Sequence, residues 1–404
     1  MPIVDVVPPP ISSLRLGHAA RFLLQDGGTF ADPGPLITGL AEALILDGVV
    51  VERFSLVLAA LHPQVAAVSV TWKKQSGAVV VEPRGWGGLT SQLFLRSPIA
   101  RFYERTHDVI RRKLCDPACA TDFEIVADLR SQGATDYLAL HLGNYAQRLN
   151  VISCTTHQPG GFTDEQLHTL LSIQPILAVV VQAHVAQRIS STLLQTYLGK
   201  DAGERVLAGQ VQRGQGEAIP ALISFCDLRD FTGLSDRLPR EALLAVLDDT
   251  FDAVVTAVSD HGGEVLKFMG DSVLTIFRAP AGEEAATCAR ARAASAEIFR
   301  RVEEKNRSRG DDVDRPRIRV ALSLHLGDVH YGNIGGPSRL DFTVVGPAVN
   351  LASRLQGLCG QLGRPALVSA AVAAHLPGFC DDLGLHVIRG LAEPVRVHGL
   401  DVGL

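Results

Sequence analysis

Apolar residues recur along the chain with two different periods, and changes of period mark the predicted elements. In the first part of the chain, strands are predicted at 65–72, 77–81, 137–140 and 150–156, and helices at 36–61 and 97–113. A Pro159-Gly160-Gly161 turn closes this part. The mixture predicts an α/β domain over residues 1–161.

A long helix is predicted after this turn. Thr163 and Gln166 have the spacing of a capping box, and apolar residues then recur at mostly helical spacing to Leu193, with a kink expected at Pro175. The helix either packs on its own domain or pairs with its copy in a second chain and passes a signal onward. Because Gly, Gln and charged residues follow it, residues 162–217 are predicted to form a helical linker.

The pattern becomes more regular after Pro220, and residues 218–404 are predicted to form a second domain. Strands are predicted at 221–226, 264–269, 272–277, 318–326 and 341–345, with helices from 239, 283 and 348. This order predicts an α+β fold in which an antiparallel-rich sheet carries helices on one face.

Composition narrows the class of protein. The chain has 404 residues, 47% of them hydrophobic and 20% charged, with a net charge of -5, which excludes a disordered or fibrous chain. No long basic run is present, so no nucleic-acid partner is predicted. Polar residues interrupt the longest apolar stretches, which are shorter than the roughly 20 residues needed to span a bilayer, so no membrane crossing is predicted. The N-terminal segment lacks the basic residues followed by an apolar core that are typical of a secretory signal, so no such signal is predicted and the protein is expected to be cytoplasmic.

The seven cysteines are scattered and odd in number, which does not suggest a disulfide framework. Cys115 and Cys119, with His107 and Cys154, leave a metal site open as an alternative to reduced cysteines without a ligand role.

Two aspartates stand at predicted strand ends. Asp227 follows the strand at 221–226, and Asp271 lies in the turn between the strands at 264–269 and 272–277. Two neighbouring carboxylates would hold Mg²⁺ with positions left open for phosphate oxygens. The run after Asp227 enters a helix or turn whose backbone N–H groups could receive phosphate. Taken alone, an aspartate in a glycine turn is typical of a structural residue.

Four segments read together closely resemble the class III nucleotidyl cyclases. They are FCDLRDFTGLS at 225–235, KFMGDSVL at 267–274, DFTVVG at 341–346 and VNLASRL at 349–355. The resemblance covers about residues 218–402 and implies a ferredoxin-like cyclase catalytic domain.

The resemblance implies an adenylate cyclase, a phosphorus–oxygen lyase that converts ATP to 3′,5′-cyclic AMP and pyrophosphate. Asp227, Asp271 and Leu228 are implied to form the metal site, which takes two Mg²⁺ or Mn²⁺ ions per active site. In that family, one metal acidifies the ribose 3′-hydroxyl, the other binds the β- and γ-phosphates, and the hydroxyl attacks the α-phosphorus in line. Positioning and charge neutralisation carry most of the rate in such reactions.

Further substrate contacts follow from the resemblance. Asn350 and Arg354 share one face of a predicted helix. They are implied to orient the ribose and to stabilise charge on the α-phosphate, respectively. Phe231 and Thr232 are implied to bind substrate, and Arg389 the triphosphate, although a solvated surface arginine stays open for Arg389.

Base choice depends on Lys267 and Thr343. A lysine ammonium can donate to adenine N1 and a threonine hydroxyl can accept from the exocyclic amine, whereas guanine presents the opposite pattern, so ATP is predicted over GTP. The threonine-bearing branch of the family includes members reported to respond to bicarbonate. The resemblance therefore makes bicarbonate, or another small molecule, a candidate regulator.

The resemblance also implies assembly. In the family, the metal aspartates of one protomer face the base-reading and transition-state residues of another, so a head-to-tail homodimer with two shared sites is predicted. The sequence departs from the family at Asp230, where a glycine is usual, and at Pro347, where an aspartate is common.

Two other functions have their own sequence signatures. A catalytically inactive cyclase-like module is the alternative, but it predicts loss of a metal, base or transition-state residue, and none is lost. A diguanylate cyclase is excluded because residues 269–273 lack its Gly-Gly-Asp/Glu-Glu-Phe motif.

Residues 137–185 resemble the closing part of a GAF-type sensor domain. If this is correct, a small ligand bound in the first half would shift the dimer between productive and unproductive states. A dimerisation domain without a ligand is the alternative, and no residue of a ligand pocket is predicted.

Overall fold

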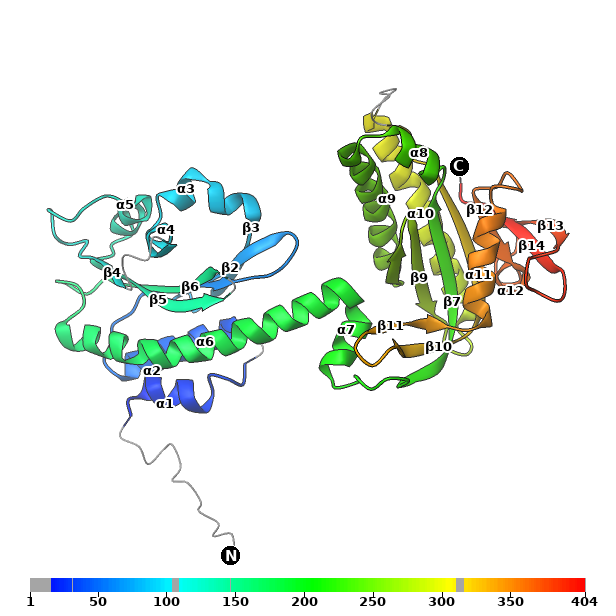
Figure 1. The fold of residues 1–404 in the computed structure, drawn as a ribbon. Helices are drawn as coiled ribbons and strands as arrows, with labels where there is room; N and C mark the ends of the chain where they lie inside the picture. Colours follow the sequence, from blue (N-terminus) through cyan, green and yellow to red (C-terminus); the bar gives the residue numbers. More distant parts are fainter. Residues whose placement is uncertain (1–15, 31, 104–108, 146, 310–315, 404) are drawn as a thin grey trace, which may run out of the picture. The chain divides into compact units, whose positions relative to one another are not determined.

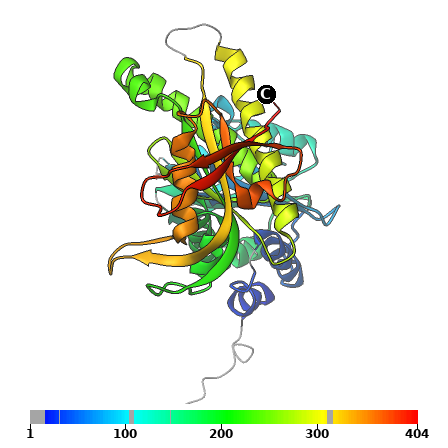
Figure 2. The ribbon, with the colours of Figure 1, turned by 90° about the vertical axis from the view of Figure 1, so that its right-hand side faces the viewer.

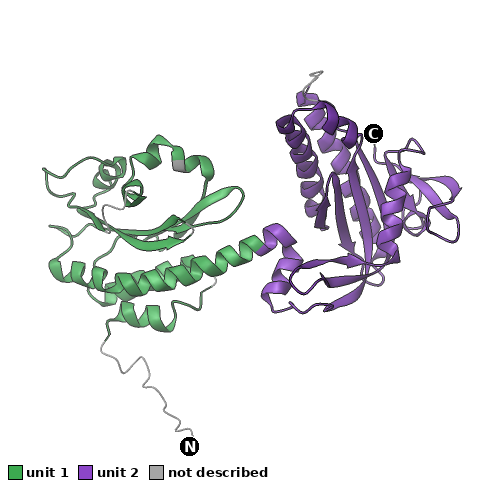
Figure 3. Ribbon diagram, viewed as in Figure 1, with its two compact units in different colours: residues 1–193 green, residues 194–404 purple. Residues whose placement is uncertain are grey.

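The computed structural model describes residues 16–30, 32–103, 109–145, 147–309 and 316–403. The chain divides into two compact units, residues 1–193 and 194–404 (Figures 1 and 3). The predicted linker at 162–217 is shared between these units.

The first unit is built on an antiparallel sheet in the order β3-β2-β1-β6-β5-β4. Its strands are β1 (Arg53–Ala59), β2 (Val65–Lys73), β3 (Val79–Gly85), β4 (Val109–Arg112), β5 (Asp136–Tyr145) and β6 (Arg148–Thr156). One face packs against α1 (His18–Gln25), α2 (Pro33–Leu46) and α6 (Asp164–Leu198). The other face is covered by η2 (Trp86–Thr90), α3 (Gln92–Leu95), α4 (Pro98–Tyr103) and α5 (Glu124–Ser131), as Figure 1 shows.

Two predicted helices are wrong in their second halves. The helix expected at 36–61 ends at Leu46, and Gly48 follows with a φ of 81°, a conformation that favours glycine. Residues 53–59 form β1 because Phe54, Leu56 and Leu58 alternate with residues of the opposite face. Likewise, the helix expected at 97–113 is α4 followed by β4, whose pairing with β5 is a tertiary contact that local pattern does not report.

The long helix α6 has 35 residues and contains Pro175. Its capping box is confirmed, since Gln166 N donates to Thr163 Oγ1 at 3.3 Å and Thr163 N donates to Gln166 Oε1 at 3.1 Å. By length and composition, α6 is the one helix among the described residues that could cross a membrane. However, Leu177 and Val181 lie in the core of the first unit, so α6 packs on its own domain. Pairing with a second copy, and the absence of a membrane crossing, stay predictions.

The second unit contains a larger, mostly antiparallel sheet in the order β13-β14-β12-β10-β7-β9-β8, with β11 paired to β10. Its elements are α7 (Lys200–Leu207), β7 (Gly216–Leu228), α8 (Phe231–Arg237), α9 (Arg240–Asp260), β8 (Glu264–Met269), β9 (Ser272–Arg278), α10 (Glu284–Arg309), β10 (Val320–Gly335), β11 (Leu340–Val345), α11 (Pro347–Leu358), β12 (Ala366–Ser369), α12 (Ala370–Ala373), β13 (Cys380–His386) and β14 (Val395–Leu400). The pair β10 and β12 is parallel. The predicted α+β fold with an antiparallel-rich sheet is therefore confirmed.

Helices cover both faces of this sheet, so the prediction of helices on one face is wrong. Leu222 and Cys226 of β7 share a core with residues of α9 and α10. The alternate residues Ile223 and Phe225 share a core with Ala352 of α11, which lies across the strands from α10 (Figure 2). The reason is visible in the sequence of β7, because a continuous apolar run is typical of a strand that is buried on both faces.

The cysteines do not form one site. Cys154 is buried in the core of the first unit, where burial raises the pKa of its thiol, while Cys115 is exposed. His107 lies outside the described residues. All seven cysteines are free, and no cluster of three or more His, Cys, Asp or Glu side chains suited to a metal occurs in the described part of the chain.

Candidate active site

The two aspartates lie side by side at one end of the central strands. Asp227 is paired in register with Ser272, the residue that follows Asp271 in the β8–β9 turn. Leu228 N also donates to the backbone carbonyl of Asp271 at 3.3 Å, which ties the end of β7 to this turn. Burial, the charge of Asp271 and a hydrogen bond with it raise the pKa of Asp227 to about 6. Folding thus holds two like charges together.

This arrangement fits a divalent cation. Carboxylate oxygens are the ligands that Mg²⁺ prefers, and a cation would offset both the burial and the repulsion that raise the pKa of Asp227. In the described residues no third acidic, His or Cys side chain completes a cluster, so further ligands would come from substrate phosphates and water. The Leu228 side chain is 2% exposed, and only its backbone is left to face this site.

Gln356 contacts this pair, although it lies in none of the sequence segments that predict the site. Its Nε2 donates to Asp227 Oδ2 at 3.0 Å, and this hydrogen bond opposes the rise in the pKa of Asp227. Gln356 lies on the sheet-facing side of α11, next to the buried Leu355 and one turn after the buried Ala352. In the sequence, the feature that could have indicated this role is a glutamine on the face of an amphipathic helix that packs against the sheet.

We expect Gln356→Met, which keeps the length of the side chain, to weaken Mn²⁺ binding about tenfold, because the partner that orients Asp227 is lost. The affinity can be measured by electron paramagnetic resonance of free Mn²⁺. Gln361→Met, at an exposed position beyond α11, is the matched control and should bind Mn²⁺ as the unmodified chain does. An unchanged affinity of the Gln356 variant would mean that the amide does not support the site.

Asn350 and Arg354 lie on a different side of α11 from Gln356. Both are exposed, and two residues of helix turn the side chain by roughly 200°, so Arg354 points away from the side that reaches Asp227. The Arg354 guanidinium donates to the backbone carbonyl of Arg389, in the loop between β13 and β14. Arg389 is exposed. The structure therefore places the Arg354 side chain against the backbone of Arg389, on a different side of α11 from the one that reaches Asp227.

Lys267 forms an ion pair that no sequence motif predicts. Its Nζ lies 2.5 Å from Asp341 Oδ2, and both side chains are 43% exposed. Thr343 lies two residues after Asp341 in β11, so the two side chains leave the same face of this strand. The alternation of side chains along β11, which places residues 341 and 343 on one face, was the feature of the sequence that could have indicated a role for Asp341.

The departures from the family pattern have local consequences. Asp230 precedes α8 with a φ of 62° and pairs with Arg237 at 3.0 Å. This left-handed conformation explains why glycine is usual there, and aspartate is among the residues that tolerate it. Phe231 and Thr232 open α8 directly after this turn. Pro347 is the first residue of α11, a position at which proline is common, so this departure is accommodated.

Comparison with known proteins identifies the class. Residues 217–380 match the adenylate and guanylate cyclase catalytic domain. The chain is 34% identical over 164 residues to adenylate cyclase 1 of Rhizobium meliloti (strain 1021), covering 39% of this chain and 23% of the relative. It is 32% identical over 192 residues to adenylate cyclase of Anabaena cylindrica, covering 47% and 37%, respectively. The chain thus spans less than two-fifths of the length of either relative.

A third relative is similar over more of its length. Adenylate cyclase 2 of Rhizobium meliloti (strain 1021) is 28% identical over 329 residues, which cover 79% of this chain and 85% of the relative. Among solved structures, the guanylyl cyclase Cya2 is 27% identical, with a TM-score of 0.41, over 46% of this chain and 93% of that chain. A bacterial light-regulated adenylyl cyclase is 20% identical, with a TM-score of 0.49, over 64% and 84%.

The second unit contains a catalytic domain of the class III nucleotidyl cyclases. The resemblance that the four sequence segments carry is confirmed at this level. The GAF-like character of the first unit stays a prediction.

Proposed function

We propose that this protein is an adenylate cyclase that converts ATP to 3′,5′-cyclic AMP and pyrophosphate. The observation that carries the proposal is the pair of adjacent carboxylates, Asp227 and Asp271, which fits divalent cations beside a turn suited to phosphate. Divalent cations bound there would acidify the ribose 3′-hydroxyl and neutralise the phosphates. The two aspartates would hold the ions, and Gln356 keeps Asp227 in place.

The other residues position the substrate. Backbone N–H groups at the start of α8, at Phe231 and Thr232, face phosphate oxygens. Asn350 orients the ribose. Arg354 stabilises the charge that develops on the α-phosphate, and Arg389, beside it, binds the triphosphate.

The proposed site is shared between two copies of the chain. Because Arg354 points away from the side of α11 that holds Asp227, one chain supplies only half of the groups that the reaction needs. A head-to-tail homodimer would place the aspartates of one copy opposite Asn350 and Arg354 of the other and form two sites.

The direct test is an assay of the purified full chain with ATP or GTP, in Mg²⁺ or Mn²⁺, with identification of the product. We expect cyclic AMP from ATP and much less cyclic GMP from GTP. Binding of ATP without any cyclic product in either metal would support the inactive nucleotide-binding module instead. The same assay with added bicarbonate, against chloride as control, tests bicarbonate as an activator.

We propose that Asp341 positions Lys267 for reading the base. The ion pair holds the ammonium where it can donate to adenine N1, next to the Thr343 hydroxyl that would accept from the exocyclic amine.

We expect Asp341→Asn to reduce the preference for ATP over GTP about tenfold in kcat/KM, since one directional contact to the base is worth on the order of 1.4 kcal/mol. Asp328→Asn, an exposed aspartate of β10, is the control and should keep the preference. If the preference of the Asp341 variant equalled that of the control, Asp341 would have no part in reading the base.

A further inference from the structure

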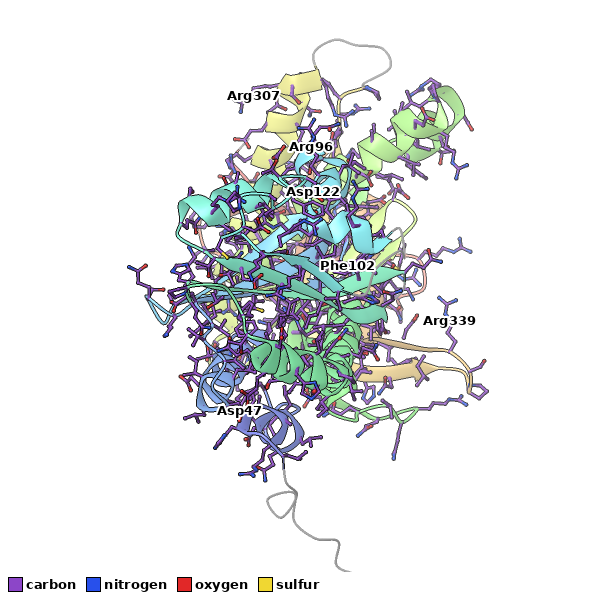
Figure 4. All side chains as sticks on the ribbon, turned by 90° about the vertical axis from the view of Figure 1, so that its left-hand side faces the viewer. Asp47, Arg96, Phe102, Asp122, Arg307 and Arg339 are labelled. Atoms are coloured by element: carbon purple, nitrogen blue, oxygen red, sulfur yellow. The ribbon has the colours of Figure 1, made fainter. Side chains whose placement is uncertain are left out.

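The sheet of the first unit has a second face that carries polar and charged side chains although it is covered. On β1, Phe54 and Leu56 point to the helical core, whereas Arg53 and Ser55 point to the side covered by η2, α3 and α4. A cavity of about 430 Å³ lies on this side, within the size range of small-molecule sites. In Figure 4, Phe102, Arg96 and Asp122 lie on this side of the sheet and Asp47 on the other. All residues that line this cavity precede the cyclase motifs in the sequence.

Arg53 lines this cavity with an unmatched charge. Its Nη1 is buried and has no hydrogen-bond partner within the described part of the protein. Lys73 is its cross-strand neighbour on β2, so a like charge stands beside it. Burial lowers the pKa of Arg53, which still leaves the guanidinium charged at neutral pH. A buried donor without a partner is costly, and a ligand that accepts from it removes this cost.

The other arginines of the cavity already have partners. Arg84 pairs with Glu82 at 2.6 Å, and Arg96 pairs with Glu124 at 3.3 Å. Arg148 lies over the Trp86 ring, 4.3 Å from its centroid, and donates to a backbone carbonyl. Four arginines and three acidic residues line the cavity in all, so its formal charge is positive.

The remaining lining is mixed in character. Hydroxyl groups lie on the sheet near Arg53, with Ser55 Oγ and Thr71 Oγ1 3.0 Å apart and Ser153 hydrogen-bonded to Tyr137. Apolar side chains provide the rest of the wall, namely Val57, Ala59, Ala66, Phe94, Ile99 and Val151. A ligand that satisfies both parts carries a charged oxygen group at one end and an apolar body at the other.

We propose that the first unit binds a small organic oxyanion in this cavity, with its carboxylate or phosphate paired to Arg53 and its apolar body against the mixed wall. The planar guanidinium suits either group, because both can accept two parallel hydrogen bonds. The site is independent of the proposed cyclase function, since none of its residues belongs to the second unit.

The test is calorimetric titration of the full chain with three probes of similar size. Benzoate and phenyl phosphate carry the oxyanion as carboxylate and phosphate, respectively, and benzamide is the neutral analogue of benzoate. We expect at least one anion to bind, benzamide to bind at least about tenfold more weakly, and Arg53→Gln to weaken binding of that anion by about 10- to 100-fold. The stronger anion identifies which oxygen group the site prefers. Arg188→Gln, which removes an exposed arginine of α6 that does not line the cavity, is the control and should keep the affinity.

A second readout is thermal stability, and its first part needs no probe. If Arg53 has no partner in the free protein, Arg53→Met should raise the melting temperature of the first unit without ligand and abolish the increase that the anion causes in the unmodified chain. The proposal is overturned if neither anion binds at millimolar concentration, if Arg53→Gln binds as tightly as the Arg188 control, or if Arg53→Met lowers the melting temperature of the free protein.

Discussion

Asp271→Asn is expected to reduce the rate of cyclic AMP formation by about 10³-fold or more, because it removes one of two charges that would hold the divalent cations. The substitution keeps the shape of the side chain and the glycine turn beside it. Its effect on turnover should therefore arise from the lost charge rather than from a distorted hairpin. The measurement is the rate of product formation at saturating ATP, with Mn²⁺ as well as Mg²⁺.

The same variant should have the opposite effect on stability. Burial and then the charge of Asp271 raise the pKa of Asp227 from the ordinary 3.8 to about 6 in the folded protein, so ionisation of Asp227 destabilises the folded state as the pH rises through this window. Without metal, Asp271→Asn should therefore melt at a higher temperature than the unmodified chain at pH 7, and this difference should vanish below about pH 4. Asp248→Asn, an exposed aspartate of α9, should change neither property. Near-normal turnover by the Asp271 variant would contradict the metal-binding role.

The second unit was largely predictable because its motifs and its burial pattern agree. The continuous apolar run before Asp227 fixes a buried central strand, and the glycine turn next to Asp271 fixes the hairpin beside it. These two local features are enough to bring the carboxylates together. The same continuous apolar run indicates that both faces of the sheet are covered, which is why the prediction of helices on one face was wrong.

The contacts that tune the site were less visible because they join elements far apart in sequence. Gln356 reaches Asp227 across 129 positions, and Lys267 reaches Asp341 across 74. Neither pair has a local spacing, and only the face of the helix or strand on which each residue lies hints at its role. Arg53 is a similar case, since a polar residue on a strand normally indicates a solvent-exposed face, and here that face is covered.

A mixture of two inactive variants is expected to recover activity. Asp227→Asn lacks a metal-binding carboxylate and Asn350→Ala lacks a group that orients the ribose, so each variant alone should have little turnover. If the site is shared, a dimer of one copy of each has one site with both defects and one site with neither. Random exchange at equal amounts makes half of the dimers mixed, so about a quarter of the unmodified activity should return.

Asn350 suits this experiment better than Arg354, because Arg354 also holds the backbone at Arg389 and its loss could move that loop. Asn350 is exposed on α11, so its truncation should leave the fold intact. A mixture of Asp227→Asn with Asp271→Asn is the matched control. Each site takes both aspartates from one copy, so every site in this mixture lacks one of them and no intact site can form. Recovery in the first mixture alone would show that two chains build each site. If the first mixture stayed inactive under conditions in which the chains exchange, each site would have to form within one chain, in conflict with the direction in which Arg354 points.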